Sequence, residues 1–264
     1  MTVRLHDDEQ SAPRRGRLLV VVAVPAEAAA VLRGLGHRED GAEAAPVPVP
    51  GGGLHRAEHP SGVTVDVLAG GVGPAAAASA ASAALAVGQY DLVLSAGIGG
   101  GFAPAAPVGA TVLAEAIVAA DLGAETPEGF ADVTELGFGT VRHTPARAAV
   151  ARAAEALGAA AGDSPVVTGT VLTVSTVTGS AARAAALTAR HPDAVAEAME
   201  GFGVAEAAAR HGVPVFELRT VSNPVGPRDR AAWRIGEALA ALERAFTALP
   251  YPELLTTSEE ARRG

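Results

Sequence analysis

The chain has 264 residues, of which 49% are hydrophobic, and this is enough for one large core. Its formal charge of −9 at pH 7 argues against a nucleic-acid partner, because such a chain has no basic surface to neutralise phosphates. Cysteine is absent, which excludes disulfides, thiolate nucleophiles and cysteine metal sites and fits a cytoplasmic protein.

The first apolar run of the chain is short, and both ends are polar. Residues 18–24 follow a cluster of arginines, but Pro25 and Glu27 come next without a cleavage-like site, so this run predicts a buried strand and not a signal peptide. No run approaches the roughly 18 apolar residues of a membrane span, so we expect no membrane partner. Residues 1–16 predict a disordered tail, and residues 251–264 a flexible C-terminal tail.

Strand and helix patterns alternate between these tails. The predicted strands cover 18–24, 63–69, 91–95, 111–119, 166–174, 195–199 and 215–221. The predicted helices cover 26–35, 75–87, 145–159, 180–190, 203–211 and 229–248. Residues 40–61 predict a loop or hairpin, and 121–140 a long loop. The pattern indicates a single α/β domain over 17–250 with a largely parallel or mixed sheet.

Glycine clusters follow two of the predicted strands, at 70–73 and at 97–101. Ligands of open α/β sheets bind outside the carboxyl ends of strands, and glycine there lets backbone N–H groups approach a ligand. Tight turns are the alternative for either cluster alone. Neither cluster fits a dinucleotide fingerprint, and the chain contains no lysine for a Walker motif.

Five segments, taken in order, are typical of one superfamily. They are Val-Ala-Val-Pro-Ala-Glu27, Gly70-Gly71-Val72-Gly73-Pro74, the loop 97–102, Met199-Glu200 and the strand 219–223. Together, over roughly residues 17–250, they resemble the nucleosidase branch of the nucleoside phosphorylases. The resemblance implies a three-layer α/β domain with a central mixed sheet flanked by helices. It also implies a nucleoside substrate, no cofactor, and a homodimer or higher homo-oligomer.

The resemblance assigns roles to three residues before the last strand. Glu27 matches the glutamate that activates the attacking water, which requires a carboxylate within hydrogen-bond reach of that water. Its alternative role is to complement the helix dipole from the first turn. Glu200 matches the residue that accepts hydrogen bonds from the ribose hydroxyls, with Met199 packed on the sugar, and a solvated glutamate at a helix start is its alternative. A carboxylate there also stabilises the positive charge of an oxocarbenium-like transition state.

Asn223 distinguishes this chain from the methylthioadenosine nucleosidases, which carry Asp at the matching place. Asn presents a donor and an acceptor, so it can serve N7 and a 6-oxo group of the same base. We therefore expect a hypoxanthine base, although an Asn capping a turn before Pro224 is the alternative. The segment 222–230, together with Trp233, resembles the matching segment of the futalosine hydrolases, nucleosidases of menaquinone biosynthesis. Asn223 is thus expected to hold the departing base.

The remaining parts of the expected site are less specific. No arginine precedes the second glycine cluster, so a phosphate nucleophile would be poorly held and hydrolysis is favoured over phosphorolysis. Contacts with the substrate are expected from Gly97, Ile98, Gly99 and Val177. The carboxyphenyl ketone tail of futalosine calls for an aromatic slot ending in a cation. The candidates for it are Phe102 and Arg228, with Phe130, Phe138, Arg230 and Arg234 as further possibilities.

Two other functions are possible for this sequence pattern. The functions are a methylthioadenosine or S-adenosylhomocysteine nucleosidase, which Asn223 disfavours, and a non-catalytic nucleoside-binding protein, which the presence of Glu27 and Glu200 disfavours. A metal site is not expected. His55 and His59 lie four residues apart, but in a Gly- and Pro-rich stretch without a third ligand.

Overall fold

The structure is a computed structural model that describes residues 16–37, 46–50, 52–162 and 164–263. Apart from Gly16, the tail predicted over 1–16 lies outside the described residues. The main sheet has the strand order β11-β10-β6-β12-β5-β1-β4-β3-β2, and β9 adds to β6. Its strands are β1 (Arg17–Val22), β2 (Val47–Val49), β3 (Gly52–Glu58), β4 (Thr64–Ala69), β5 (Leu92–Gly101), β6 (Thr111–Ala119), β9 (Arg142–His143), β10 (Val166–Thr173), β11 (Ala194–Ala198) and β12 (Val215–Pro224).

Parallel pairing sends several strand ends to the same edge of the sheet. Strands β4, β1, β5 and β12 are parallel neighbours, as are β6, β10 and β11, and β6 joins the two sets by an antiparallel pairing to β12. The sheet also curls, because β11 forms a second, antiparallel pairing with β5. The carboxyl ends of β5, β11 and β12 are thereby brought together.

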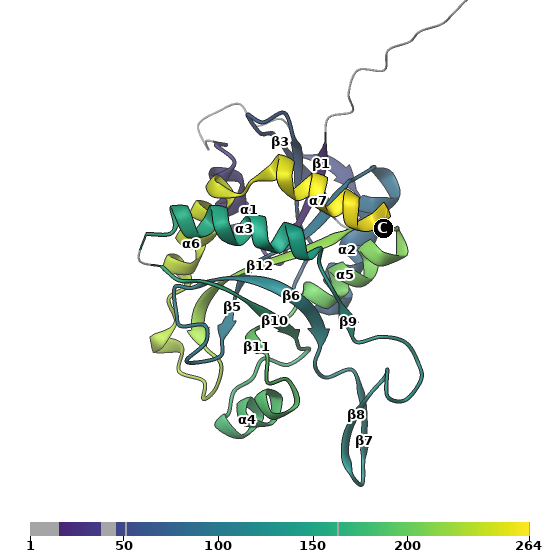
Figure 1. Cartoon of the computed structure of the whole chain (residues 1–264), viewed down its shortest axis with the longest axis vertical. Coiled ribbons are helices and arrows are strands. Elements are labelled where there is room, and N and C mark those ends of the chain that lie inside the picture. Colours follow the sequence, from purple (N-terminus) through teal and green to yellow (C-terminus); the bar gives the residue numbers. More distant parts are fainter. Residues whose placement is uncertain (1–15, 38–45, 51, 163, 264) are drawn as a thin grey trace, which may run out of the picture.

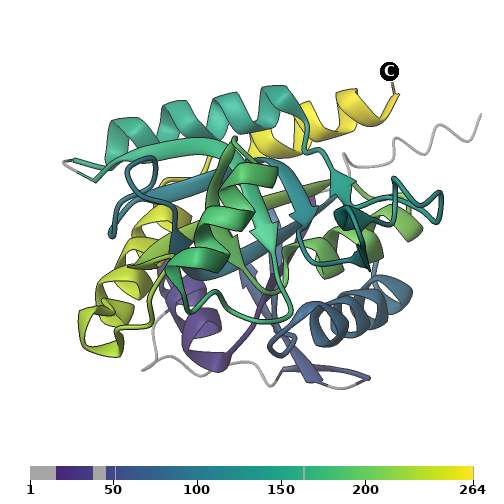
Figure 2. The ribbon, with the colours of Figure 1, turned by 90° about the horizontal axis from the view of Figure 1, so that it is seen from below.

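Helices cover both faces of the sheet because its strands are apolar on both sides. In β1, Leu18 and Val20 belong to a core cluster with Phe246, whereas Leu19 and Val21 belong to a second cluster with Ala77 and Val204. Figure 2 shows α3 and α7 along one side of the sheet and α2 along the opposite side. The helices are α1 (Pro25–Gly34), α2 (Pro74–Val87), α3 (Arg147–Ala160), α4 (Ala181–Arg190), α5 (Gly201–Arg210), α6 (Ile235–Ala248) and α7 (Tyr251–Arg263). The expected mixed sheet flanked by helices is confirmed.

Three details differ from the sequence-based predictions. The flexible tail expected over 251–264 is wrong for 251–263, where α7 buries Tyr251 and Leu254 against the core. The long loop expected over 121–140 contains the hairpin β7 (Gly123–Thr126) and β8 (Gly129–Asp132), which extends at the lower end of Figure 1. The last predicted helix begins at Ile235 and not at 229, because Asp229 caps a short 3₁₀ turn, η1 (Arg230–Ala232).

Candidate active site

A cavity of about 320 Å³ opens where the strand ends converge, and it is called the catalytic cavity below. Its walls come from the segments that follow β1, β4 and β10 and from the last residues of β5, β11 and β12. The lining residues are Ala23, Val24, Glu27, Val72, Ile98, Gly99, Gly100, Val177, Glu197, Ala198, Met199, Glu200, Ser222, Asn223 and Trp233. Seven of the sequence-predicted site residues belong to this set: Glu27, Ile98, Gly99, Val177, Met199, Glu200 and Asn223.

Glu27 is held rigidly in the first turn of α1. Its Oε2 accepts the backbone N–H groups of Ala23 and Val24 at 2.9 and 3.2 Å, and its Oε1 accepts that of Ile98 at 2.9 Å. Glu27 therefore caps the N-terminus of α1, as its alternative role in the helix implies, and it also lines the cavity. Burial raises the pKa of this carboxyl above its ordinary value, against the opposing effects of the Ile98 N–H and the Arg219 charge. A buried carboxylate with a raised pKa is suited to accept a proton near neutral pH.

Glu200 lies just before α5 and is joined to a buried arginine. Its Oε1 accepts the N–H of Gly73 at 3.2 Å, and its Oε2 accepts a hydrogen bond from Arg219 Nη1 at 3.1 Å. Arg219 also donates from Nε to Glu217 Oε1 and from Nη2 to Ser95 Oγ, both at 2.9 Å. The Arg219 and Glu217 side chains are fully buried. One guanidinium thus links two carboxylates behind the cavity wall.

Two glycines make room for these charged groups. A Cβ on Gly97, whose φ is +150°, would lie 2.6 Å from Glu27 Oε1 and 3.0 Å from Arg219 Nη1. A Cβ on Gly201 would lie 2.3 Å from Glu217 Oε1. Gly97 therefore contributes by admitting Glu27 and Arg219 close to the strand, and it belongs to β5, which continues through the glycine cluster to Gly101.

Asn223 stands near the end of β12 with its amide already oriented. Its Oδ1 accepts the hydroxyl of Ser222 at 2.8 Å, and its Nδ2 donates to the carbonyl of Pro224 at 3.1 Å. The hydrogen bond to the Pro224 carbonyl is the local contact expected if Asn223 caps a turn before Pro224. An amide has two N–H groups and two lone pairs on oxygen, so a donor and an acceptor direction remain for a ligand.

The loop 174–180 forms the wall at Val177, whose side chain is 44% exposed. Glu197 fastens this loop, because its Oε1 accepts the N–H of Thr178 at 2.8 Å and its Oε2 accepts the Thr178 hydroxyl. Glu197 is itself buried and lines the cavity. Burial raises the pKa of Glu197 above its ordinary value, although the Thr178 hydrogen bonds oppose the rise.

The aromatic wall of the cavity is Trp233, with Arg228 beside it. The Arg228 guanidinium lies 5.9 Å from the centre of the Trp233 ring, within the range of a cation–π contact. Phe102, a candidate for the substrate tail, lies elsewhere. It is buried in a core cluster with Leu172, Val174 and Leu187, and it is not part of the cavity lining. Of the other aromatic candidates, Phe130 stacks on Arg190 and Phe138 is 82% exposed, both outside this lining.

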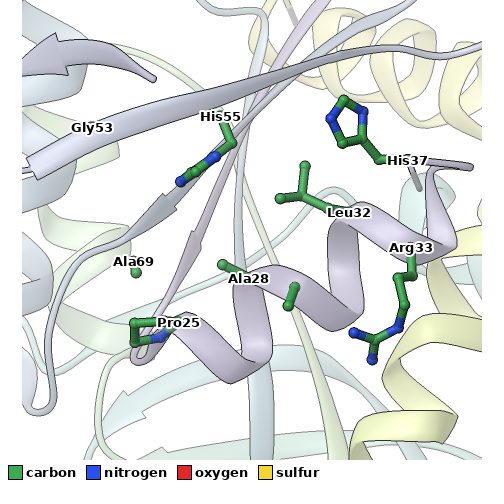
Figure 3. A pocket seen from close by; sticks show the side chains of 9 residues that line it. Pro25, Ala28, Leu32, Arg33, His37, Gly53, His55 and Ala69 are labelled. Atoms are coloured by element: carbon green, nitrogen blue, oxygen red, sulfur yellow. The ribbon is translucent and has the colours of Figure 1, made fainter. Parts of the chain in front are cut away.

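A second cavity of about 310 Å³ lies between α1 and the strand that carries Gly53 and His55. Figure 3 shows Ala28, Leu32 and Arg33 on the α1 side and His55 on the strand side. The residues that line it are Pro25, Ala28, Ala29, Leu32, Arg33, His37, Gly53, His55 and Ala69. This set contains no carboxylate, whereas Glu27, the carboxylate of α1, lines the catalytic cavity.

Sequence reasoning missed three members of the charged network, Ser95, Glu217 and Arg219 as a partner of Glu200. It also missed Glu197, which lies outside that network and bonds Thr178. A signal existed for two of them, since Glu217 and Arg219 interrupt a strand whose neighbours are apolar, and buried charges require partners. Within the described ranges, no group of three or more histidine or acidic side chains is placed to hold a metal ion. None of the helices described has both the length and the apolar character needed to cross a bilayer.

Comparison with known proteins agrees with this geometry. The model of the phosphorylase superfamily matches residues 17–249. The futalosine hydrolase of Streptomyces coelicolor is 62% identical over 230 residues, which cover 85% of this chain and 91% of that protein. The futalosine hydrolase of Acidothermus cellulolyticus is 48% identical over 231 residues, covering 88% and 89%.

A solved structure shares the fold at lower identity. The 5′-methylthioadenosine/S-adenosylhomocysteine nucleosidase of Colwellia psychrerythraea, in complex with adenine, superposes with a TM-score of 0.74 at 22% identity, covering 93% of this chain and 96% of that one. The chain belongs to the phosphorylase superfamily and, within it, to the futalosine hydrolase family. The resemblance seen in the sequence is thereby confirmed.

Proposed function

We propose that this chain hydrolyses the N-glycosidic bond of futalosine and releases hypoxanthine, as a step of menaquinone biosynthesis. The observation that carries the proposal is the pair of buried carboxylates, Glu27 and Glu200, in one cavity whose wall also carries Asn223. The high identity to two futalosine hydrolases supports the choice of substrate.

Glu27 acts as the general base in this proposal. Three N–H donors fix its carboxylate, so the group loses little freedom when it orients a water molecule toward the anomeric carbon. Its raised pKa strengthens it as a base relative to an ordinary glutamate. As the new C–O bond forms, one proton of the water passes to Glu27. The bonding electrons of the cleaved C–N bond leave with the hypoxanthine ring, which takes up a proton from solvent.

Glu200 and Met199 hold the ribose. One Glu200 oxygen is tied to Arg219 and the other to Gly73, so the carboxylate cannot turn away from the cavity. It accepts hydrogen bonds from the sugar hydroxyls, and its charge stabilises the oxocarbenium-like state as the glycosidic bond stretches. Met199, also in the cavity wall, packs on the sugar face.

Water is the proposed nucleophile because the cavity disfavours an anion. The charged residues among its described lining residues are Glu27, Glu197 and Glu200, all acidic. Arg219 lies behind this wall and is engaged by carboxylates. A phosphate would meet repulsion from these carboxylates, and none of the described lining residues is a cation that could hold it.

Trp233 and Arg228 form the proposed subsite for the 5′ tail. An aromatic face beside a guanidinium matches an aryl carboxylate, because the ring stacks on Trp233 while the carboxylate pairs with Arg228. We also propose a homodimer or higher homo-oligomer, in which the exposed Phe138 of the 121–140 segment meets the neighbouring subunit.

The test is chromatography of free base after incubation with futalosine, methylthioadenosine or inosine, each with and without phosphate. Hypoxanthine from futalosine, independent of phosphate, is the expected result. Adenine from methylthioadenosine at a higher rate would overturn the substrate, and dependence on phosphate would overturn hydrolysis. The Glu27→Gln variant is the control for catalysis by this site.

A further inference from the structure

Glu197 occupies a position in the catalytic cavity that the proposed mechanism does not use. In the pairing of β11 with β5, Glu197 lies opposite Gly100, and in the pairing of β12 with β5, Asn223 lies opposite the same Gly100. Glu197 and Asn223 therefore flank one residue of β5 from its two sides. With neighbouring strands about 4.8 Å apart, their Cα atoms are separated by roughly 10 Å or less, a span that a bicyclic base can bridge.

The Glu197 carboxylate retains capacity to bind a further donor. Thr178 gives one hydrogen bond to each of its oxygens, and each carboxylate oxygen can accept two. The side chain is buried, so a second donor would meet it in a low-dielectric setting where charge-assisted hydrogen bonds are strong. Nearby, Val177 and Ala198 supply apolar wall on which a flat base can rest.

The two common purines differ at the atom that such a carboxylate would contact. In hypoxanthine, N1 carries a hydrogen and is a donor, whereas in adenine N1 is an acceptor. A carboxylate accepts a hydrogen bond from the N1–H of hypoxanthine, whereas it faces, and is repelled by, the N1 lone pair of adenine. Asn223 reads N7 and the 6-substituent, so a group at N1 would complete recognition of the base edge.

We propose that Glu197 is a specificity-determining residue that accepts the N1–H of a 6-oxopurine and rejects adenine. The inference rests on the proposed function, because it names the base contact of the same site. The competing explanation is that Glu197 only holds the Thr178 loop in place. These explanations differ in one measurable respect: loss of a loop anchor weakens binding of both bases, whereas loss of an N1–H acceptor weakens the 6-oxo base alone.

The test compares Glu197→Gln with Thr178→Val. The first removes the carboxylate charge, and the second removes only the hydroxyl that anchors the loop. We expect Glu197→Gln to lower kcat/KM for futalosine roughly tenfold to a hundredfold, while kcat/KM for its 6-amino counterpart stays unchanged or rises. Thr178→Val should change both substrates by the same factor. An equal loss on both substrates in Glu197→Gln would overturn the proposal.

Binding of the free bases gives a second measurement. Calorimetry of the wild-type protein should show hypoxanthine binding at least tenfold more tightly than 1-methylhypoxanthine, and Glu197→Gln should reduce that ratio. Equal affinity of the wild type for both bases would overturn the role of Glu197. This measurement needs no turnover, so it stays decisive if futalosine is not the substrate, whereas absence of hypoxanthine release would overturn the proposed function alone.

Discussion

Replacement of Arg219 by methionine removes the cation that two buried carboxylates share. Arg219 is fully buried and hydrogen-bonded to Glu217, Glu200 and Ser95, so its loss leaves two acidic side chains without their counter-charge. Breaking a buried ion pair by removing one partner costs about 3–5 kcal/mol. Against a typical total of about 5–15 kcal/mol for a domain, a loss of this size is readily measured.

The expected loss depends on pH in a defined direction. Burial already raises the pKa of Glu217, and the Arg219 charge opposes that rise. Without Arg219 the pKa of Glu217 rises further, so protonation relieves the uncompensated charge at a higher pH than in the wild type. The stability deficit of Arg219→Met should therefore be largest at pH 7 and smaller at pH 5.

Urea unfolding followed by circular dichroism at both pH values measures this deficit, since urea does not screen charges. Arg56→Met is the matched control, because Arg56 also pairs with a buried carboxylate, Asp66, but is itself 41% exposed. Asp66 keeps Arg17 and Tyr90 as partners, so the control should lose about 1 kcal/mol or less. A deficit of Arg219→Met below that of the control, or one that is the same at both pH values, would refute the reasoning.

Three further predictions concern single side chains. The acidic limb of the kcat–pH profile should lie above the ordinary glutamate pKa, since a base must be ionised and burial raises the pKa of Glu27. Glu27→Gln should abolish that limb and lower kcat by about 10²–10⁴-fold; an unchanged limb would assign the base to another group. Burial alone would raise the pKa of Asp66, but hydrogen bonds from Arg56, Arg17 and Tyr90 lower it, so Asp66 stabilises the fold above its unfolded pKa and loses this effect as the pH falls. Asp66→Asn should thus unfold about 1–3 kcal/mol more easily at pH 7, and the difference should shrink as the pH falls below the unfolded pKa of Asp66, as urea titrations over a pH series can show. Asn223→Asp should shift the ratio of kcat/KM for 6-amino over 6-oxo substrates upward by roughly tenfold to a hundredfold, and an unchanged ratio in competitive assays would remove Asn223 from base selection.

Much of the fold follows from local pattern. The continuous apolar run at 18–22 predicts a strand buried on both faces, and the structure buries it between two helical layers. Pro25 in the first turn and the alanine-rich periodicity after it predict α1 for the same local reasons. Because parallel strands deliver their carboxyl ends to one edge, the placement of Glu27, Met199, Glu200 and Asn223 in one cavity was also predictable.

Only the tertiary structure decided how the remaining groups combine. Whether Phe102 faces a ligand or the core depends on the direction of one side chain, and packing against Leu172 and Leu187 sends it inward. Glu197 meets the cavity only because the sheet curls and β11 pairs with β5 across nearly a hundred residues of sequence. The sequence by itself determined most strands and helices between residues 17 and 248, since these depend on local periodicity, but not the hairpin β7–β8, the start of α6 or α7. The linkage of Arg219 to Glu200 and Glu217 and the placement of Glu197 required long-range strand pairing, which local periodicity does not encode.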